Sequence, residues 1–128
     1  MSRSGYSDDC EHLGLYRANI QRTINGKRGQ AFLRELAESL DAMPEKVLIR
    51  SELISAKGQV CTIGSVCKAK GIDVSEVDIF DPESVGKLVG ISSILAAEIE
   101  FENDERDSSE TPGGRWSRMR KWVGENLK

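Results

Sequence analysis

Cysteine and histidine are the residues of this chain best suited to metal binding or nucleophilic catalysis, and its 128 residues include three cysteines and one histidine. These are Cys10, His12, Cys61 and Cys67. Their spacings, C-x-H and C-x5-C, lack the C-x2-C or H-x3-H pattern from which a tetrahedral zinc site is easily built. We therefore expect no metal and no cofactor, although the spacing leaves open whether these four side chains ever bind a metal.

The cysteines also bear on the redox state of the chain. An odd number of cysteines cannot form a closed disulfide framework within one chain, so we expect reduced thiols. Cys61 and Cys67 are flanked by Val60, Ile63 and Val66. This apolar setting predicts buried thiols that behave as small hydrophobic side chains.

Other catalytic patterns are weak in this sequence. A Ser-His-Asp or Cys-His enzyme would depend on His12, which lies in a polar N-terminal stretch. Paired-carboxylate catalysis needs two acids that converge in a cleft, and the spacing of the acids does not indicate convergence. Residues 25–30 lack the G-x4-G-K-[ST] pattern of a phosphate-binding loop, and residues 103–107 lack the glycine of a calcium loop. We expect a protein that is not an enzyme.

Length and composition bound the class of protein. A chain of 128 residues with 38% hydrophobic and 30% charged residues suits one soluble domain, which we place at 11–128, behind a loose tail at 1–10. No apolar stretch approaches the roughly 18–20 residues of a membrane span. The first ten residues lack the apolar core of a signal peptide. These features predict a cytoplasmic protein with no membrane partner.

Hydrophobic spacing and capping residues predict six helices. A recurrence of apolar residues every three or four positions predicts helices at 16–24 and 29–43, the second ended by Pro44. A third is expected at 63–70, closed by Gly71. The last three are expected to begin after Asp81, Ser92 and Thr111, three residues that favour helix N-caps, and to reach about 90, 103 and 127.

A β-hairpin is expected between the second and third helices. Within 46–62, two short β-branched arms flank a polar segment that contains Gly58. The resulting fold class is α+β, a mostly helical single domain of four to six short helices with a small β-hairpin.

The net charge of -3 conceals two opposed blocks. Residues 98–110 carry seven acids and one base, and residues 115–128 carry five bases and one acid. The blocks could attract each other within the fold, in which case we expect Glu98 or Glu102 to pair with an arginine of the last helix. Alternatively, they could contact a partner.

A partner surface is suggested by the composition of the last helix. Its apolar positions share one face, and Trp122 lies off that face among arginines, a composition that is enriched at protein interfaces. Another segment could instead cover Trp122, and an exposed Trp122 could serve a homodimer. The candidate contacts are Arg115, Arg118, Lys121 and Trp122 on the helix and Glu102, Asp104, Glu105 and Asp107 in the acidic block.

Nucleic-acid binding is the alternative function. It would use the basic blocks at 17–34 and 115–128, with Lys27 and Arg28 as contacts. A solvated helix face explains the first block better, because no aromatic residues interleave there for base stacking. A helix-turn-helix at 84–103 is disfavoured, since its second helix is acidic and would repel DNA.

Several stretches together resemble a known group of proteins. They are the opening MSRSGYSDD, GKRGQAFL at 26–33, LDAMPEK at 40–46, GQVC at 58–61, Ile99 with ENDE at 102–105, and ETP at 110–112 with Arg115-Trp116 and Trp122-Val123. With these stretches the chain resembles a widespread family of small uncharacterised proteins encoded by tailed bacteriophages and prophages.

The resemblance implies a phage product that acts in the cytoplasm of a bacterial host, and it carries over no catalytic residue, cofactor or ligand. We expect a non-enzymatic accessory protein that binds and modulates or inhibits a bacterial host protein, such as a defence complex. The acidic block could make ordinary contacts with that protein or mimic DNA.

Overall fold

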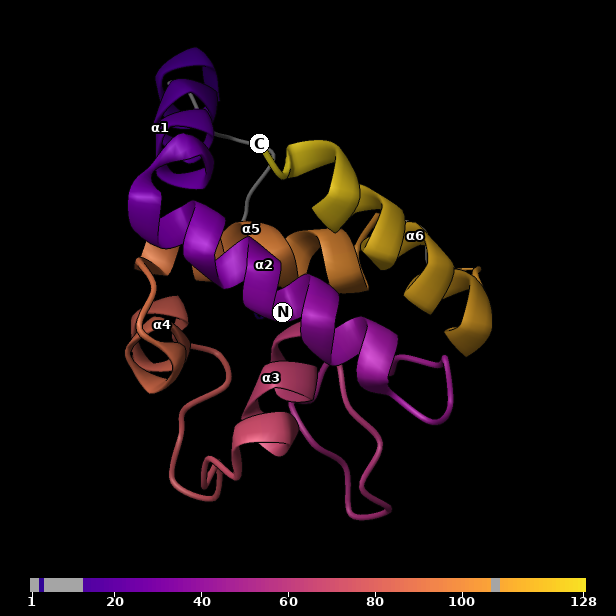
Figure 1. The fold of residues 1–128 in the computed structure, drawn as a ribbon. Helices are drawn as coiled ribbons and strands as arrows, with labels where there is room; N and C mark the ends of the chain where they lie inside the picture. Colours follow the sequence, from indigo (N-terminus) through magenta and orange to yellow (C-terminus); the bar gives the residue numbers. More distant parts are fainter. Residues whose placement is uncertain (1–2, 4–12, 107–108) are drawn as a thin grey trace.

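Six α-helices make up most of the chain that the structure, a computed structural model, describes, namely residues 3, 13–106 and 109–128. They are α1 (Leu13–Asn25), α2 (Lys27–Ala42), α3 (Thr62–Lys70), α4 (Pro82–Val89), α5 (Ser93–Asp104) and α6 (Pro112–Asn126) (Figure 1). All six predicted helices are confirmed, with ends that shift by a few residues. No helix among the described residues is long and apolar enough to cross a lipid bilayer.

The predicted α+β class is wrong, because the described chain is all-α. Residues 46–62 do turn back on themselves, but they form a single isolated antiparallel bridge, between Ile54 and Val60, in place of a hairpin. The chain also takes the left-handed conformation at Ser51, with φ of 68°, which interrupts the first arm.

Backbone groups of the first arm are used by other elements, and this explains the missing hairpin. The Leu48 amide donates to the carbonyl of Pro112, at the start of α6, at 3.1 Å. The carbonyls of Leu48 and Ile49 accept hydrogen bonds from the side chains of Arg115 and Asn103. Strand pairing would need these same groups. The backbone of this segment instead forms hydrogen bonds with α5 and α6.

Local capping sets the ends of the helices. The side chains of Asp81, Ser92 and Thr111 each accept a hydrogen bond from a backbone amide in the first turn of α4, α5 and α6. Gly71 and Gly90 close α3 and α4 in the left-handed conformation. These N-caps and the Gly71 C-cap are confirmed, because each depends on residues only a few positions apart.

The helices enclose one hydrophobic core. In Figure 1, α2 runs diagonally across the front, with α3 below it and α6 to its right, and it packs against both. α5 packs against α1, α3, α4 and α6. Leu36, Leu40, Ile63, Ile99 and Met119 are fully buried at the meeting points of these helices.

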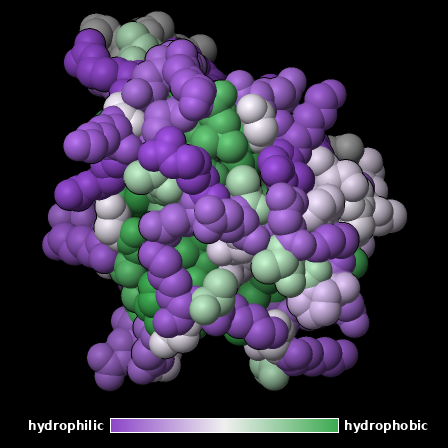
Figure 2. Space-filling model, in the orientation of Figure 1, coloured by the Kyte–Doolittle hydropathy of each residue, from purple (hydrophilic) through white to green (hydrophobic). Residues whose placement is uncertain are grey.

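The surface of the same face is largely hydrophilic, and hydrophobic side chains reach it in patches, one of them at the lower left near α4 (Figure 2). Phe80, in the loop before α4, is a large hydrophobic side chain that is mostly exposed, at 56%. The predicted tail at 1–10 lies outside the described residues except for Arg3, whose side chain is buried.

Candidate functional site

The second half of α5 carries charged side chains into the interior. Glu98, Glu100, Glu102 and Asp104 are all buried, as is Asn103 between them. Transfer of an unpaired carboxylate from water to the interior is very costly, so these groups need hydrogen bonds or cations. These four acids of the acidic block are therefore internal to the fold along α5, and several of their partners come from far along the chain.

Arg3 is the partner of two of these acids. Its guanidinium donates from Nη2 to Asp104 Oδ1 at 2.9 Å and from Nε to the other oxygen of the same carboxylate. Its Nη1 lies 3.2 Å from Glu100 Oε2 and 3.7 Å from Cys61 Sγ. Burial opposes the charge of Arg3, whereas the thiol and the two carboxylates favour it, so the pKa of Arg3 is raised above its ordinary value.

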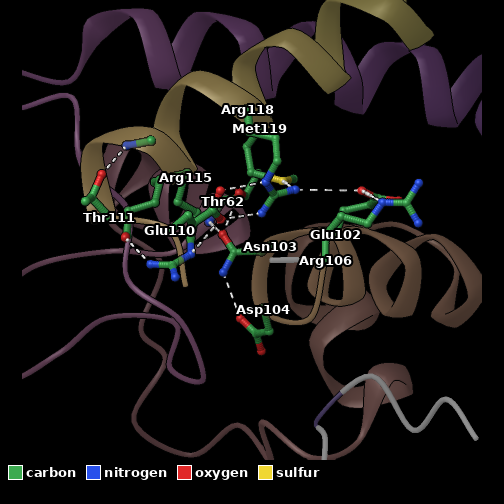
Figure 3. A network of polar contacts seen from close by, with 12 residues as sticks. Thr62, Glu102, Asn103, Asp104, Arg106, Glu110, Thr111, Arg115, Arg118 and Met119 are labelled. Carbon is green, nitrogen blue, oxygen red and sulfur yellow. Dashed lines mark hydrogen bonds and ion pairs between the residues drawn. The ribbon is translucent and has the colours of Figure 1, made fainter. Parts of the chain in front are cut away.

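Asn103 of α5 lies close to Thr62, at the start of α3 (Figure 3), and also bonds to the irregular segment before α3. Its Oδ1 accepts from the amide of Thr62 at 3.0 Å and from the hydroxyl at 2.7 Å. Its Nδ2 donates to the carbonyl of Ile49 at 3.0 Å and to Asp104 Oδ1 at 2.7 Å. All four hydrogen bonds of the amide are thus made inside the protein.

The basic helix α6 pairs with the acidic block. Arg118 donates two hydrogen bonds to Glu110 and lies 3.8 Å from Glu102 Oε2, which also lies 3.7 Å from Arg106 Nε. The prediction that an acid of α5 pairs with an arginine of the last helix is confirmed for Glu102. Glu98 pairs instead with Arg17 of α1, at 3.2 Å.

Two further arginines hold α6 in place. Arg115 is buried and donates from Nη1 to the carbonyl of Leu48 at 2.9 Å, while its Nε lies 3.3 Å from Glu110 Oε1. Burial lowers the pKa of Arg115, against the effect of Glu110. Arg120, on another side of the helix, donates to both oxygens of Asp41 in α2 at 2.8 and 3.1 Å.

The structure separates the predicted contact residues. Glu102, Asp104 and Arg115 are buried, Arg118 is half-buried in its ion pairs, and Trp122 is half-buried against the core. Glu105 and Lys121 are exposed, and Asp107 lies outside the described residues. The described members of the set thus do not form one exposed surface, and their use by a partner stays a prediction.

The first basic block is more accessible. Arg22, Lys27, Arg28 and Arg34, on α1 and α2, are exposed, and none of them forms an ion pair within the described part of the chain. Arg17 keeps half of its side chain exposed while it pairs with Glu98. The structure therefore leaves four cations on the outer surface of α1 and α2.

An open groove, with a volume of about 560 Å³, lies between the end of α2, α3 and the loop at 57–60. Met43, Pro44, Val47 and Val60 contribute its main apolar surface, and Lys57 and Lys68 line it with their charges. Lys68 Nζ donates to the Gly58 carbonyl at 2.6 Å, which fixes one cation at the loop.

The lining of the groove offers few of the side chains that commonly act in catalysis. Glu45 is the only acid among its lining residues, and neither histidine nor cysteine lines it. Ser65, one of its hydroxyl groups, donates to the carbonyl of Thr62 at 2.6 Å. The lining therefore holds no nucleophile next to a general base.

The two described cysteines have structural roles. Cys61 and Cys67 are buried and free, as predicted, and the Cys61 sulfur accepts from the Gly64 amide at 3.3 Å to cap α3. Burial raises the pKa of Cys67 to about 11, which keeps it a thiol at neutral pH. No group of three metal-ligating side chains occurs in the described residues, and Cys10 and His12 lie outside them.

Sequence reasoning missed the Arg3 pocket and the groove. Arg3 and Asp104 are 101 residues apart, so no local spacing connects them. It also missed Lys46, whose Nζ lies 5.3 Å from the ring centroid of Trp116, while Trp116 Nε1 donates to the carbonyl of Leu40 at 3.2 Å. The stretch MPEK at 43–46, which contains Lys46, entered the sequence analysis only as part of the resemblance to phage proteins.

Comparison with known proteins adds no assignment. No family model, no curated protein and no solved structure matches this chain. The likeness to phage and prophage proteins thus remains an expectation from the sequence.

Proposed function

We propose that this protein is a non-enzymatic binding protein that docks on a partner protein through the groove between α2 and α3. The resemblance noted in the sequence suggests the partner, a bacterial host protein that a phage or prophage product modulates or inhibits. The observation that supports docking is the groove itself, which is open, has a volume of about 560 Å³, and is lined mainly by apolar groups and by two exposed lysines.

The lining of the groove indicates the chemistry of the partner segment. Met43 and Val47 remain partly exposed, so an apolar side chain that enters the groove would remove their surface from water. Lys57 and Lys68 would attract a neighbouring carboxylate and set the orientation of the segment. The groove therefore suits a short apolar and acidic segment of another protein.

The test is a comparison of matched lysine variants. Binding partners are captured from a bacterial lysate with the wild-type protein, and the recovered protein is purified and titrated calorimetrically against each variant. We expect Lys57→Glu to weaken binding by about tenfold or more, because it reverses a charge that faces the acidic segment. Lys87→Glu, at an exposed position of α4, is the matched control and should bind as the wild type does.

The titration also discriminates between surfaces. Equal affinity of Lys57→Glu and the wild type would refute docking at the groove. A loss of affinity in Lys121→Glu or Trp122→Ala, with Lys57→Glu unaffected, would assign the contact to α6 instead. Thermal unfolding of each variant shows whether a loss of affinity reflects a loss of fold.

Nucleic-acid binding is a second candidate, favoured by the four exposed cations of α1 and α2. A phosphate backbone that contacts this surface would release counterions, so binding would weaken steeply with salt. We expect the double variant Lys27→Glu/Arg28→Glu to abolish such binding in a fluorescence anisotropy titration with duplex DNA and RNA. No binding by the wild type near physiological ionic strength would exclude this candidate.

A further inference from the structure

The side chain of Arg3 is buried in a pocket formed by two acids of α5 and a cysteine. The side chain of Arg3 is 2% exposed, and its guanidinium is surrounded by Asp104 and Glu100 of α5 and by Cys61, the N-cap of α3. Asp104 accepts two hydrogen bonds from the same guanidinium, the two-pronged geometry that arginine makes with a carboxylate. A lysine could not reproduce this geometry, because its ammonium is a single point of charge.

The pocket is held in place by groups other than Arg3. Asp104 Oδ1 also accepts from the Ser51 amide at 3.1 Å and from Asn103 Nδ2 at 2.7 Å. Cys61 Sγ accepts from the Gly64 amide at the first turn of α3. The site is thus preorganised by the body of the fold, and an incoming guanidinium would find its acceptors already oriented.

The pocket also has more acceptor capacity than Arg3 uses. Both carboxylate oxygens of Glu100 are buried, and neither accepts a hydrogen bond from a described residue, although Oε2 lies 3.2 Å from Arg3 Nη1. Two carboxylates thus face one guanidinium. Without a cation, Asp104 would be a buried charge with no partner of opposite sign, so an empty pocket is strongly unfavourable.

The position of Arg3 in the chain bears on whether its side chain can be displaced from the pocket. Arg3 precedes α1, which begins at Leu13, so it belongs to none of the six helices. Withdrawal of its side chain would therefore break no helical hydrogen bond. A tethered side chain competes with ligands in solution through its effective concentration, which for short tethers is on the order of millimolar.

From these observations, we propose that the pocket is an arginine-binding site that the chain fills with its own Arg3, and that an arginine side chain on another polypeptide competes for it. Asp104 recognises the planar fork of the guanidinium, and Glu100 places a second carboxyl group 3.2 Å from Nη1. Binding of the external arginine and release of Arg3 exchange one cation for another, so the pocket keeps its charge balance throughout.

The experiment removes the tethered occupant and offers a free one. The full-length Arg3→Ala variant is titrated with a fluorescent peptide of sequence MSRSGYSDD and with the same peptide carrying neutral citrulline in place of arginine. We expect Arg3→Ala to bind the arginine peptide at least about tenfold more tightly than the citrulline peptide, and about tenfold more tightly than wild type does. The double variant Arg3→Ala/Asp104→Asn should lose this preference, and Arg22→Ala should behave as wild type.

Two results would overturn the proposal. One is a folded Arg3→Ala variant that does not distinguish the two peptides. The other applies if Arg3→Ala is too unstable to titrate, in which case its thermal unfolding is measured with millimolar methylguanidinium or methylammonium at the same ionic strength. We expect methylguanidinium to raise the thermal midpoint more than methylammonium does. Equal midpoints with the two cations would show that the pocket does not select a guanidinium.

Discussion

Arg118 donates to both carboxylate oxygens of Glu110, from Nε to Oε2 at 2.9 Å and from Nη2 to Oε1 at 2.6 Å. Glu110 lies immediately before Thr111, the N-cap of α6, so the pair ties the middle of the helix to its own entry. The same guanidinium lies 3.8 Å from Glu102 on α5. One arginine therefore links the basic helix to two acids that the sequence places in the acidic block.

Replacement of Glu110 should destabilise the fold. Glu110→Gln removes the charge from the pair with Arg118 and from the Oε1 contact with buried Arg115. We expect a loss of about 2 kcal/mol in the free energy of unfolding, the scale for hydrogen bonds to charged groups. Urea unfolding measures it, with Glu83→Gln as the control, since Glu83 forms an exposed pair with Lys87 and should change stability by less than about 0.5 kcal/mol. Equal losses in the two variants would contradict this interpretation of Glu110.

Asn103 should be sensitive even to a conservative change. In Asn103→Asp, the side chain can still accept from Thr62 but can no longer donate to the carbonyl of Ile49 or to Asp104. It also places two carboxylates side by side. We expect this variant to be destabilised by about 3 kcal/mol, and at least as much as Asn103→Ala, which also leaves the Thr62 donors unpaired but adds no buried charge beside Asp104. Thermal unfolding of both variants at neutral pH measures the difference. An Asn103→Asp variant that is more stable than Asn103→Ala would refute this prediction.

Glu100 predicts a pH dependence of stability. Burial raises its pKa to about 7, with Arg3 acting in the opposite direction and Asp104 adding to the rise, whereas in the unfolded chain it titrates near its ordinary 4.5. Between these values, the unfolded state loses the proton that the native state keeps. The contribution of Glu100 is thus fully present below about pH 4.5 and is lost as the pH rises to about 7, a change of about 3 kcal/mol.

The Glu100→Gln variant isolates this contribution. Glutamine keeps the shape of the neutral carboxyl group and does not titrate, so the variant should lose less stability than wild type between pH 5 and pH 8. Urea unfolding at several pH values gives the two curves. Parallel curves for the variant and wild type would exclude Glu100 as the titrating group.

Gly64 should not tolerate any side chain. A Cβ built on Gly64 would lie 1.9 Å from the carbonyl oxygen of Leu53, a backbone atom that itself accepts from the Cys61 amide. Gly64→Ala must therefore separate α3 from the segment before it, and we expect a loss of about 3 kcal/mol or more. Gly124→Ala is the control, because position 124 is an exposed site on α6 where a Cβ meets nothing closer than 3.4 Å, and this variant should stabilise the helix by about 0.5–1 kcal/mol. A thermal midpoint of Gly64→Ala equal to wild type would refute the close approach.

The positions of the helices could be predicted because their signals are local. Asp81, Ser92 and Thr111 cap helices whose first amides lie two or three residues away, and Gly71 closes α3 within one turn. Propensity, apolar spacing and capping all act over a few residues, and here they agree with the final fold. The mutual pairing of the two charge blocks was also within reach, since opposite charges on consecutive helices attract each other.

The hairpin and the role of the acidic block depended on contacts that no local pattern contains. The β-branched arms of 46–62 have strand propensity, but the carbonyls of Leu48 and Ile49 bond instead to side chains more than 50 residues away. Asp104, predicted to face a partner, is buried because Arg3 reaches it from the opposite end of the chain. The charge pattern alone shows that the acids need cations. Only packing, which brings distant residues together, decides whether those cations come from solvent, a partner or the same chain.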